Sequence, residues 1–171
     1  MSKNEEEKDF IRVMDTNDLE LVFSWRNHPD ISSHMLTQHS ITREEHKLWF
    51  KRGTESIDKQ LLIYERNGIP SGFVSFTNTF QGGVSDWGFY TAPGATKGTG
   101  LRLGNAALSY GFNSIGLHKV CGQVVVTNDA SVRMHCKLGF REEGVLRDQF
   151  KSKSGYVNLI CFGLLNNEWL F

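Results

Sequence analysis

Two glycines and a threonine, set between a predicted strand and a predicted helix, form the first candidate site. Residues 84–101 read VSDWGFYTAPGATKGTGL: a strand, a Pro-Gly break, and a Gly98-Thr99-Gly100 turn that begins a helix. The first amides of a helix lack intrahelical acceptors and lie at the positive end of its dipole, and glycine lets a phosphate approach them closely. Lys97 adds a positive charge one residue upstream. The turn is therefore a candidate diphosphate site, with ordinary turn chemistry as the alternative.

A second stretch groups side chains that could hold an acceptor molecule. Residues 25–30 read Trp-Arg-Asn-His-Pro-Asp at the end of a predicted helix. Arginine binds phosphate or carboxylate groups, asparagine and histidine bind hydroxyls, and tryptophan offers a flat face. The alternative is a plain helix end, at which Arg26 and His28 meet the negative end of the dipole. The residues predicted to bind substrate are Trp25, Arg26, Asn27, His28 and Met35.

Three polar residues share one face of a predicted helix near residue 130. Asn128, Ser131 and His135 are spaced i, i+3 and i+7, so their side chains point the same way. Cys136 is expected to face the core with Val132, which argues against a covalent route through this cysteine. No pair of histidine and carboxylate has the spacing of metal ligands, so no metal site is predicted.

Composition favours a single globular domain. The chain has 171 residues with 19 basic and 19 acidic side chains, so a sequence-independent hold on nucleic acid or on an anionic membrane is not expected. Cys121, Cys136 and Cys161 are far apart in apolar segments, which is typical of reduced thiols in a cytoplasmic protein. The acidic start MSKNEEEKDF does not resemble a secretory signal, and no run is long and apolar enough to span a membrane. About the first eight residues are expected to fray.

Hydrophobic periodicity predicts the elements that position these residues. The helices begin at capping pairs, Asn17 with Glu20 and Thr42 with Glu45, and an Asn67-Gly68 turn joins two strands as a hairpin. Strands are predicted at 10–13, 61–64, 73–76, 84–91, 119–126, 146–151 and 156–165, and helices at 17–28, 42–50, 100–115 and 128–139. The chain is therefore a mixed α/β (α+β) domain without repeats or linkers.

Two motifs in this order resemble the GNAT superfamily of acyl-CoA N-acyltransferases. Gly98-Thr99-Gly100 after a strand is similar to its pyrophosphate loop. Residues 128–140, NDASVRMHCKLGF, are similar to its second signature: an Asn, a small residue three positions later, and a terminal Leu-Gly-Phe. The motifs lie about 30 residues apart, and the resemblance covers essentially residues 1–171 as one domain. It implies the GNAT fold, a mixed and mostly antiparallel sheet of about seven strands flanked by about four helices, with acetyl-CoA as co-substrate.

Within the superfamily, residues 25–31 and the pair Glu45-His46 are similar to a branch that acetylates a nucleotide-linked amino sugar. This resemblance implies acetyl transfer to the 4-amino group of a UDP-linked 4-amino-4,6-dideoxy-N-acetyl hexose, the acetylation step of pseudaminic acid synthesis. It also suggests a cytoplasmic enzyme and a homodimer. Two alternatives stay open: a protein N-terminal acetyltransferase, which residues 128–144 also suit, and a non-catalytic acyl-CoA-binding module.

The resemblance also implies roles for individual residues. Asp86 would act as a base through water, and Ser131 is placed with the catalytic residues. His135, where many members have a tyrosine, would either protonate the departing thiolate, which predicts a narrower and more acidic pH optimum, or only pack. Ala95 stands where the family's loop usually has Arg or Gln, so Lys97 would supply that phosphate contact. The residues expected to bind acetyl-CoA are Phe89, Tyr90, Thr91, Lys97, Gly98, Thr99, Gly100, Leu101, Asn128 and Ser131.

Overall fold

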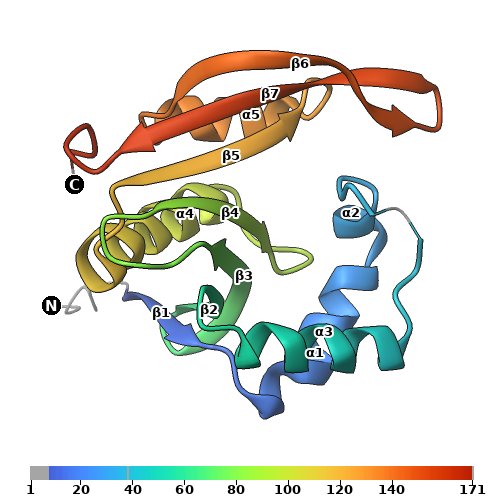
Figure 1. Cartoon of the computed structure of the whole chain (residues 1–171). Coiled ribbons are helices and arrows are strands. Elements are labelled where there is room, and N and C mark those ends of the chain that lie inside the picture. The colour runs from blue at the N-terminus through green and yellow to red at the C-terminus, as the bar shows by residue number, and fades with distance from the viewer. Residues whose placement is uncertain (1–7, 38, 171) are drawn as a thin grey trace, which may run out of the picture.

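The structure is a computed structural model that describes residues 8–37 and 39–170. Its centre is a seven-stranded sheet in the order β1-β2-β3-β4-β5-β7-β6 (Figure 1). Neighbouring strands are antiparallel except β4 and β5, which confirms the predicted mixed and mostly antiparallel sheet. The predicted fraying falls almost wholly on residues 1–7, which lie outside the described part. The strands are β1 (Asp9–Val13), β2 (Lys59–Arg66), β3 (Ile69–Thr77), β4 (Val84–Thr91), β5 (Lys119–Val125), β6 (Arg141–Ser152) and β7 (Gly155–Leu165).

The described residues form five α-helices where about four were predicted. The helical elements are a 3-10 turn η1 (Thr16–Asp18), α1 (Leu19–Asn27), α2 (Pro29–Ser32), α3 (Arg43–Glu55), α4 (Thr99–Ser109), a π-helical end η2 (Tyr110–Ile115) and α5 (Asp129–Lys137). The additional helix is the single turn α2. Pro29 ends α1 as predicted but also begins α2, because proline at the first helical position has the right φ and needs no amide partner.

The first helix begins differently from the prediction, since Asn17 and Glu20 do not cap it. Instead, the Asp15 carboxylate accepts from the Asn17 amide (2.7 Å) and the Asp18 carboxylate accepts from the Asp15 amide (3.0 Å), which forms a capping box around η1. Asp18 also accepts from both terminal nitrogens of Arg12 (2.7 and 2.8 Å), and this contact lowers the pKa of its buried carboxyl. The start of α1 is thus fastened to β1.

The sheet has an apolar core on each face, because successive residues of a strand point to opposite sides. Leu61 of β2 packs with residues of α1 and α3, whereas its neighbour Leu62 packs with residues of α4 and α5. In β4, Phe89 lies on the α4–α5 side and Tyr90 on the α1–α3 side. Figure 1 shows α1, α2 and α3 gathered together, apart from α4 and α5. Side chains on the two faces of the sheet therefore pack into two separate apolar cores.

The parallel strands β4 and β5 pair over a short length. Their pairing ends where Asp86 lies opposite Cys121. Beyond that point β4 continues to Thr91 paired with β3 alone, and β5 continues to Val125 paired with β7 alone. The two strands therefore separate, and one backbone edge of β4 has no strand partner in the described residues.

Candidate active site

The predicted phosphate turn lies at the N-terminus of α4. Gly98 is the N-cap residue, with a φ of 94° that favours glycine, and a Cβ added there would meet nothing within 4 Å. The Arg102 amide donates to the Gly98 carbonyl (3.2 Å), but the amides of Gly100 and Leu101 find no backbone acceptor in the described residues. The turn therefore presents free N–H groups at the positive end of an 11-residue helix, as a diphosphate requires.

Cationic side chains lie around this turn. Lys97 is exposed within the loop. Arg66, at the end of β2, donates to Thr96 Oγ1 (3.1 Å), which lies 3.2 Å from Thr99 Oγ1. Arg66 was not among the predicted residues, yet its guanidinium contacts Thr96, the residue that follows Ala95. Two cations thus stand near Ala95, the position at which the loop of the GNAT superfamily usually has Arg or Gln.

Phe89 and Tyr90, which are among the residues expected to bind acetyl-CoA, lie on the part of β4 that has separated from β5. Phe89 packs against Trp87, with ring centroids 4.8 Å apart, on the α4–α5 face. Tyr90 packs against Phe73, at 5.2 Å, on the opposite face. The open edge of β4 around these residues offers backbone amides of the kind that stabilise a developing oxyanion.

A cavity of about 330 Å³ opens on the α1–α3 face beside Tyr90. We term it the acceptor cavity; its lining residues are Arg26, Thr37, His39, Ile41, Glu45, His46, Trp49, Phe73, Ser75 and Tyr90. Burial raises the pKa of the Tyr90 phenol, so this wall is uncharged at neutral pH. Because Tyr90 belongs to the separated part of β4, the cavity adjoins the place expected for the thioester.

Arg26 brings an incompletely bonded guanidinium to the acceptor cavity. Its Nη2 donates to the Thr37 carbonyl (2.8 Å), whereas Nη1 is buried without a hydrogen-bond partner in the described residues. Burial lowers the pKa of the guanidinium, which still stays charged because arginine titrates far above neutrality. A buried donor without a partner costs about 1–3 kcal/mol. An oxygen of a bound molecule would relieve that cost.

The other predicted substrate residues do not line the acceptor cavity. Trp25 is buried in the α1–α3 core. The Asn27 amide bonds to the backbone of Ile41, donating to its carbonyl (2.9 Å) and accepting from its N–H (2.8 Å). His28 caps α2, and Met35 is partly buried in the loop that follows. Asn27 thus positions the loop that forms a wall of the cavity.

His46 is a histidine with one nitrogen free, and sequence reasoning gave it no role of its own. Its Nε2 lies 3.0 Å from the Leu19 carbonyl, which can only accept, so Nε2 carries the proton. Nδ1 makes no hydrogen bond within the described part of the chain and is therefore an available acceptor. Burial lowers the pKa of the imidazole, and Trp49 stacks on the ring at 5.1 Å. His46 thus lines the acceptor cavity as a neutral imidazole with one nitrogen open as an acceptor.

His135 is also neutral, but both of its nitrogens are occupied. Trp87 Nε1 donates to Nε2 (3.2 Å), so the proton lies on Nδ1, which donates to the Ser131 carbonyl (2.8 Å). The side chain is 2% exposed, stacked on Phe162 and edge-on to Phe140. Burial lowers its pKa. This environment supports the packing alternative for His135 over the role of an acid.

The orientation of α5 corrects one expectation. Cys136 is exposed, and the prediction that it faces the core was wrong, because α5 turns His135 toward the sheet instead. Asn128 caps the helix by accepting from the Ser131 amide (3.2 Å). Asp86, the predicted base, is exposed on β4 outside the lining of the acceptor cavity. It lies at the end of the β4–β5 pairing, four residues before Tyr90.

Among the described residues, none of the helices has the length and apolarity needed to cross a membrane. Within the same residues, no three His, Cys, Asp or Glu side chains are arranged to hold a metal ion. The three cysteines are free thiols.

Known proteins resemble this chain in sequence and in fold. Residues 10–141 match the family model of the acetyltransferase (GNAT) domain. The chain is 29% identical over 123 residues to acetyltransferase PseH of Campylobacter jejuni, which is 71% of this chain and 76% of that protein. It is 23% identical over 163 residues to the spermidine N(1)-acetyltransferase of Vibrio cholerae, covering 94% of each.

Solved structures support the same assignment. The crystal structure of spermidine N-acetyltransferase from Vibrio cholerae, in complex with CoA and spermine, matches with a TM-score of 0.87 at 22% identity. The match covers 95% of this chain and 98% of that one, which confirms the fold. Since the family model spans most of the sequence and the α4 turn has the geometry of a diphosphate site, the non-catalytic alternative gives way. The chain belongs to the GNAT acetyltransferase family and is an N-acetyltransferase that uses acetyl-CoA.

Proposed function

We propose that the protein acetylates the 4-amino group of a UDP-linked 4-amino-4,6-dideoxy-N-acetyl hexose, the acetylation step of pseudaminic acid synthesis. The observation that carries this proposal is the Arg26 guanidinium in the acceptor cavity, with Nη1 buried and without a partner. A nucleotide sugar supplies hydroxyl, carbonyl and phosphate oxygens as acceptors, whereas a polyamine would bring further positive charge. Similarity to PseH supports the same class of acceptor.

A polyamine is the second candidate. The solved neighbour is a spermidine acetyltransferase, and Glu45 places a carboxylate in the lining of the acceptor cavity. However, the Glu45 carboxylate already accepts from the Thr42 amide (2.7 Å) and lies 3.2 Å from His39 Nε2. Glu45 is therefore occupied by the cap of α3, while the charge of Arg26 is not neutralised by an ion pair in the described residues. This difference favours the sugar.

The proposed reaction is direct attack of the neutral amine on the thioester carbonyl carbon. A C–N bond forms, the C–S bond breaks, and CoA leaves as its thiolate, which takes a proton from solvent water. His46, whose ring lines the acceptor cavity and whose Nδ1 has no hydrogen-bond partner in the described residues, would take the proton that the nitrogen loses. Amides on the open edge of β4 would stabilise the developing oxyanion, and the α4 turn with Lys97 would hold the diphosphate of acetyl-CoA. In this scheme His135 supports the fold, and Ser131 holds it through its carbonyl.

Free-thiol release from acetyl-CoA tests the proposal directly. The purified protein is incubated with the UDP-linked 4-amino sugar, with spermidine, and with a panel of short peptides that have free N-termini. We expect thiol release with the sugar at least a hundredfold faster than with the other acceptors. Thiol release with spermidine alone would show that the acceptor is a polyamine, and release with peptides alone would show that the protein acetylates N-termini.

A further inference from the structure

A second concavity runs along α3, next to the acceptor cavity. It has a volume of about 460 Å³. We term it the α3 groove; it is lined by Glu45, Leu48, Trp49, Arg52, Gly53, Ser56 and Lys59. Glu45 and Trp49 line both spaces, so the groove begins where the acceptor cavity ends. A molecule whose amine lies in the acceptor cavity could therefore extend into the α3 groove.

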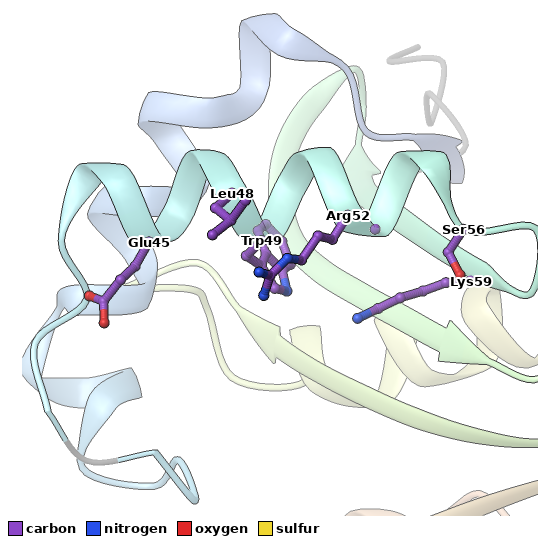
Figure 2. Close-up of a pocket in the computed structure, with 7 residues that line it drawn as sticks. Glu45, Leu48, Trp49, Arg52, Ser56 and Lys59 are labelled. Atoms are coloured by element: carbon purple, nitrogen blue, oxygen red, sulfur yellow. The ribbon is translucent and has the colours of Figure 1, made fainter.

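The far part of the α3 groove carries positive charge. Figure 2 shows the side chains of Arg52 and Lys59 reaching toward the same space beside Trp49. Neither cation forms an ion pair within the described part of the chain. By contrast, Arg43 on the same helix pairs with Glu20, and Lys51 lies 4.0 Å from Glu55. Both cations that face the groove thus lack a carboxylate partner in the described residues, as does Lys47, which lies on the same helix outside the groove.

The remaining lining is rigid and partly apolar. Helix α3 packs so closely on β2 that a Cβ added at Gly53 would lie 2.6 Å from Leu61 Cδ1. Trp49 is fixed between the His46 ring and Phe73, with centroids 5.1 and 5.5 Å away. Leu48 is 47% exposed at the rim. The cations therefore stand on a wall that does not need to rearrange before a ligand binds.

We propose that the α3 groove binds the diphosphate of the acceptor, with Arg52 and Lys59 contacting its oxygens while the amino sugar occupies the acceptor cavity. This assignment rests on the proposed function and adds the place of the nucleotide part. A diphosphate fits the groove because two cations can each form charge-assisted hydrogen bonds to it. A polyamine extended along the same path would bring its amino groups against these two cations. The groove thus selects against the second candidate.

Titration calorimetry with UDP alone tests the groove without any turnover. The variants are Arg52→Gln with Lys59→Gln, and the matched control is Lys51→Gln, which removes a charge from the same helix outside the groove. We expect UDP to bind the wild type, the control to bind within twofold of it, and the double variant to bind at least tenfold more weakly. Absence of UDP binding to the wild type, or equal binding to the double variant, would overturn the proposal.

Turnover separates this inference from the proposed function. With the UDP-linked amino sugar, the double variant should raise KM at least tenfold, while KM for acetyl-CoA stays unchanged. With the same amino sugar lacking UDP, wild type and double variant should behave alike. If the wild type binds UDP through these cations but does not acetylate the sugar, the acceptor assignment fails and the groove stands. If turnover of the nucleotide sugar is normal in the double variant, the groove assignment fails and the acceptor assignment stands.

Discussion

The two buried histidines, one on each face of the sheet, show how similar environments lead to different uses. His46 and His135 each donate one ring N–H to a backbone carbonyl, and burial lowers the pKa of both. The difference is the second nitrogen. In His135 it accepts from Trp87, whereas in His46 it has no partner in the described residues and the ring lines a cavity.

The hydrogen bonding of the second ring nitrogen distinguishes a structural histidine from one that can take part in a reaction. A neutral imidazole with both nitrogens bonded is a satisfied core residue, and moving its proton would break a buried hydrogen bond. A neutral imidazole with one fixed N–H and one open nitrogen is prepared to accept a proton. The α1–α3 face therefore carries the histidine that is the candidate base for the acceptor. The histidine on the α4–α5 face instead stabilises the packing where β4 and β5 separate.

The largest effect is expected from His46→Gln. Glutamine can still donate to the Leu19 carbonyl but cannot take a proton, so kcat should fall by about 10²–10⁴-fold with KM for acetyl-CoA unchanged. In the wild type the rate should fall only below the ordinary histidine pKa of about 6.5, because burial lowers the pKa at which His46 becomes protonated, and the variant should lose this dependence. Steady-state rates between pH 5.5 and 9 measure both. If the variant kept the wild-type kcat, His46 would not be the general base.

Arg26→Gln should mainly weaken binding of the acceptor. Loss of a charged donor to a substrate oxygen is worth about 1.5–3 kcal/mol, so KM for the nucleotide sugar should rise roughly 10- to 100-fold. Arg43→Gln, which removes an exposed guanidinium elsewhere on the same face, is the control and should change KM less than twofold. Initial rates with varied acceptor at saturating acetyl-CoA give these values. If the Arg26→Gln variant instead acetylated spermidine faster than the sugar, the result would support a polyamine as the acceptor.

His135→Gln should change stability rather than the pH profile. The variant disturbs the hydrogen bonds to Trp87 and Ser131 in a buried site, and the free energy of unfolding should fall by about 1–3 kcal/mol. Urea denaturation measures the loss, and the pH dependence of kcat should keep its wild-type shape. A large drop in kcat with a shifted pH optimum, in a variant that still folds, would support His135 as the general acid.

A smaller effect concerns the pH dependence of stability. Both histidines are held neutral in the folded protein, so the unfolded chain binds more protons below its histidine pKa near 6.5. Stability is therefore fully present above about pH 6.5 and is lost as pH falls toward the lowered folded-state pKa values. Each histidine should therefore contribute to a loss of stability between pH 7.5 and 5.5. Denaturation midpoints of wild type, His46→Gln and His135→Gln at the two pH values should show a smaller loss in each variant.

Local signals in the sequence predicted much of the fold. The Thr42 and Glu45 capping box starts α3, and the Asn67-Gly68 turn has φ values of 53° and 77° as a tight hairpin needs. Gly139 ends α5 with a φ of 91°. Each of these depends on residues within a few positions of one another, so no tertiary contact is needed to recognise them.

Two predictions of detail were wrong. The cap of the first helix was assigned to Asn17 and Glu20, although Asp15 and Asp18 have the same local spacing and form the capping box in the structure. Cys136 was assigned to the core side because it is adjacent to His135 and points away from the polar side of the helix, but the space opposite α5 is shaped by Gly122, where a Cβ would lie 2.6 Å from His135 Nε2. A glycine on β5 thus makes room for the polar ring.

The acceptor cavity lay beyond local reasoning. Its lining joins α1, the following loop, α3, β3 and β4, and the sequence separates these segments by tens of residues. Arg26 was recognised because it stands among other polar residues. Ser75 and Phe73 were not, since alternating residues of a strand look alike until the sheet register shows which face is open.

The short pairing of β4 with β5 has a consequence for how the protein opens. Three residue pairs join these strands, compared with eight between β2 and β3. Amide hydrogens along the β4–β5 junction should therefore exchange with solvent sooner than those of the β2–β3 hairpin. A co-substrate that donates and accepts hydrogen bonds along the open edge would act as a temporary strand and slow that exchange. Loading with acetyl-CoA would then complete the sheet as well as supply the acetyl group.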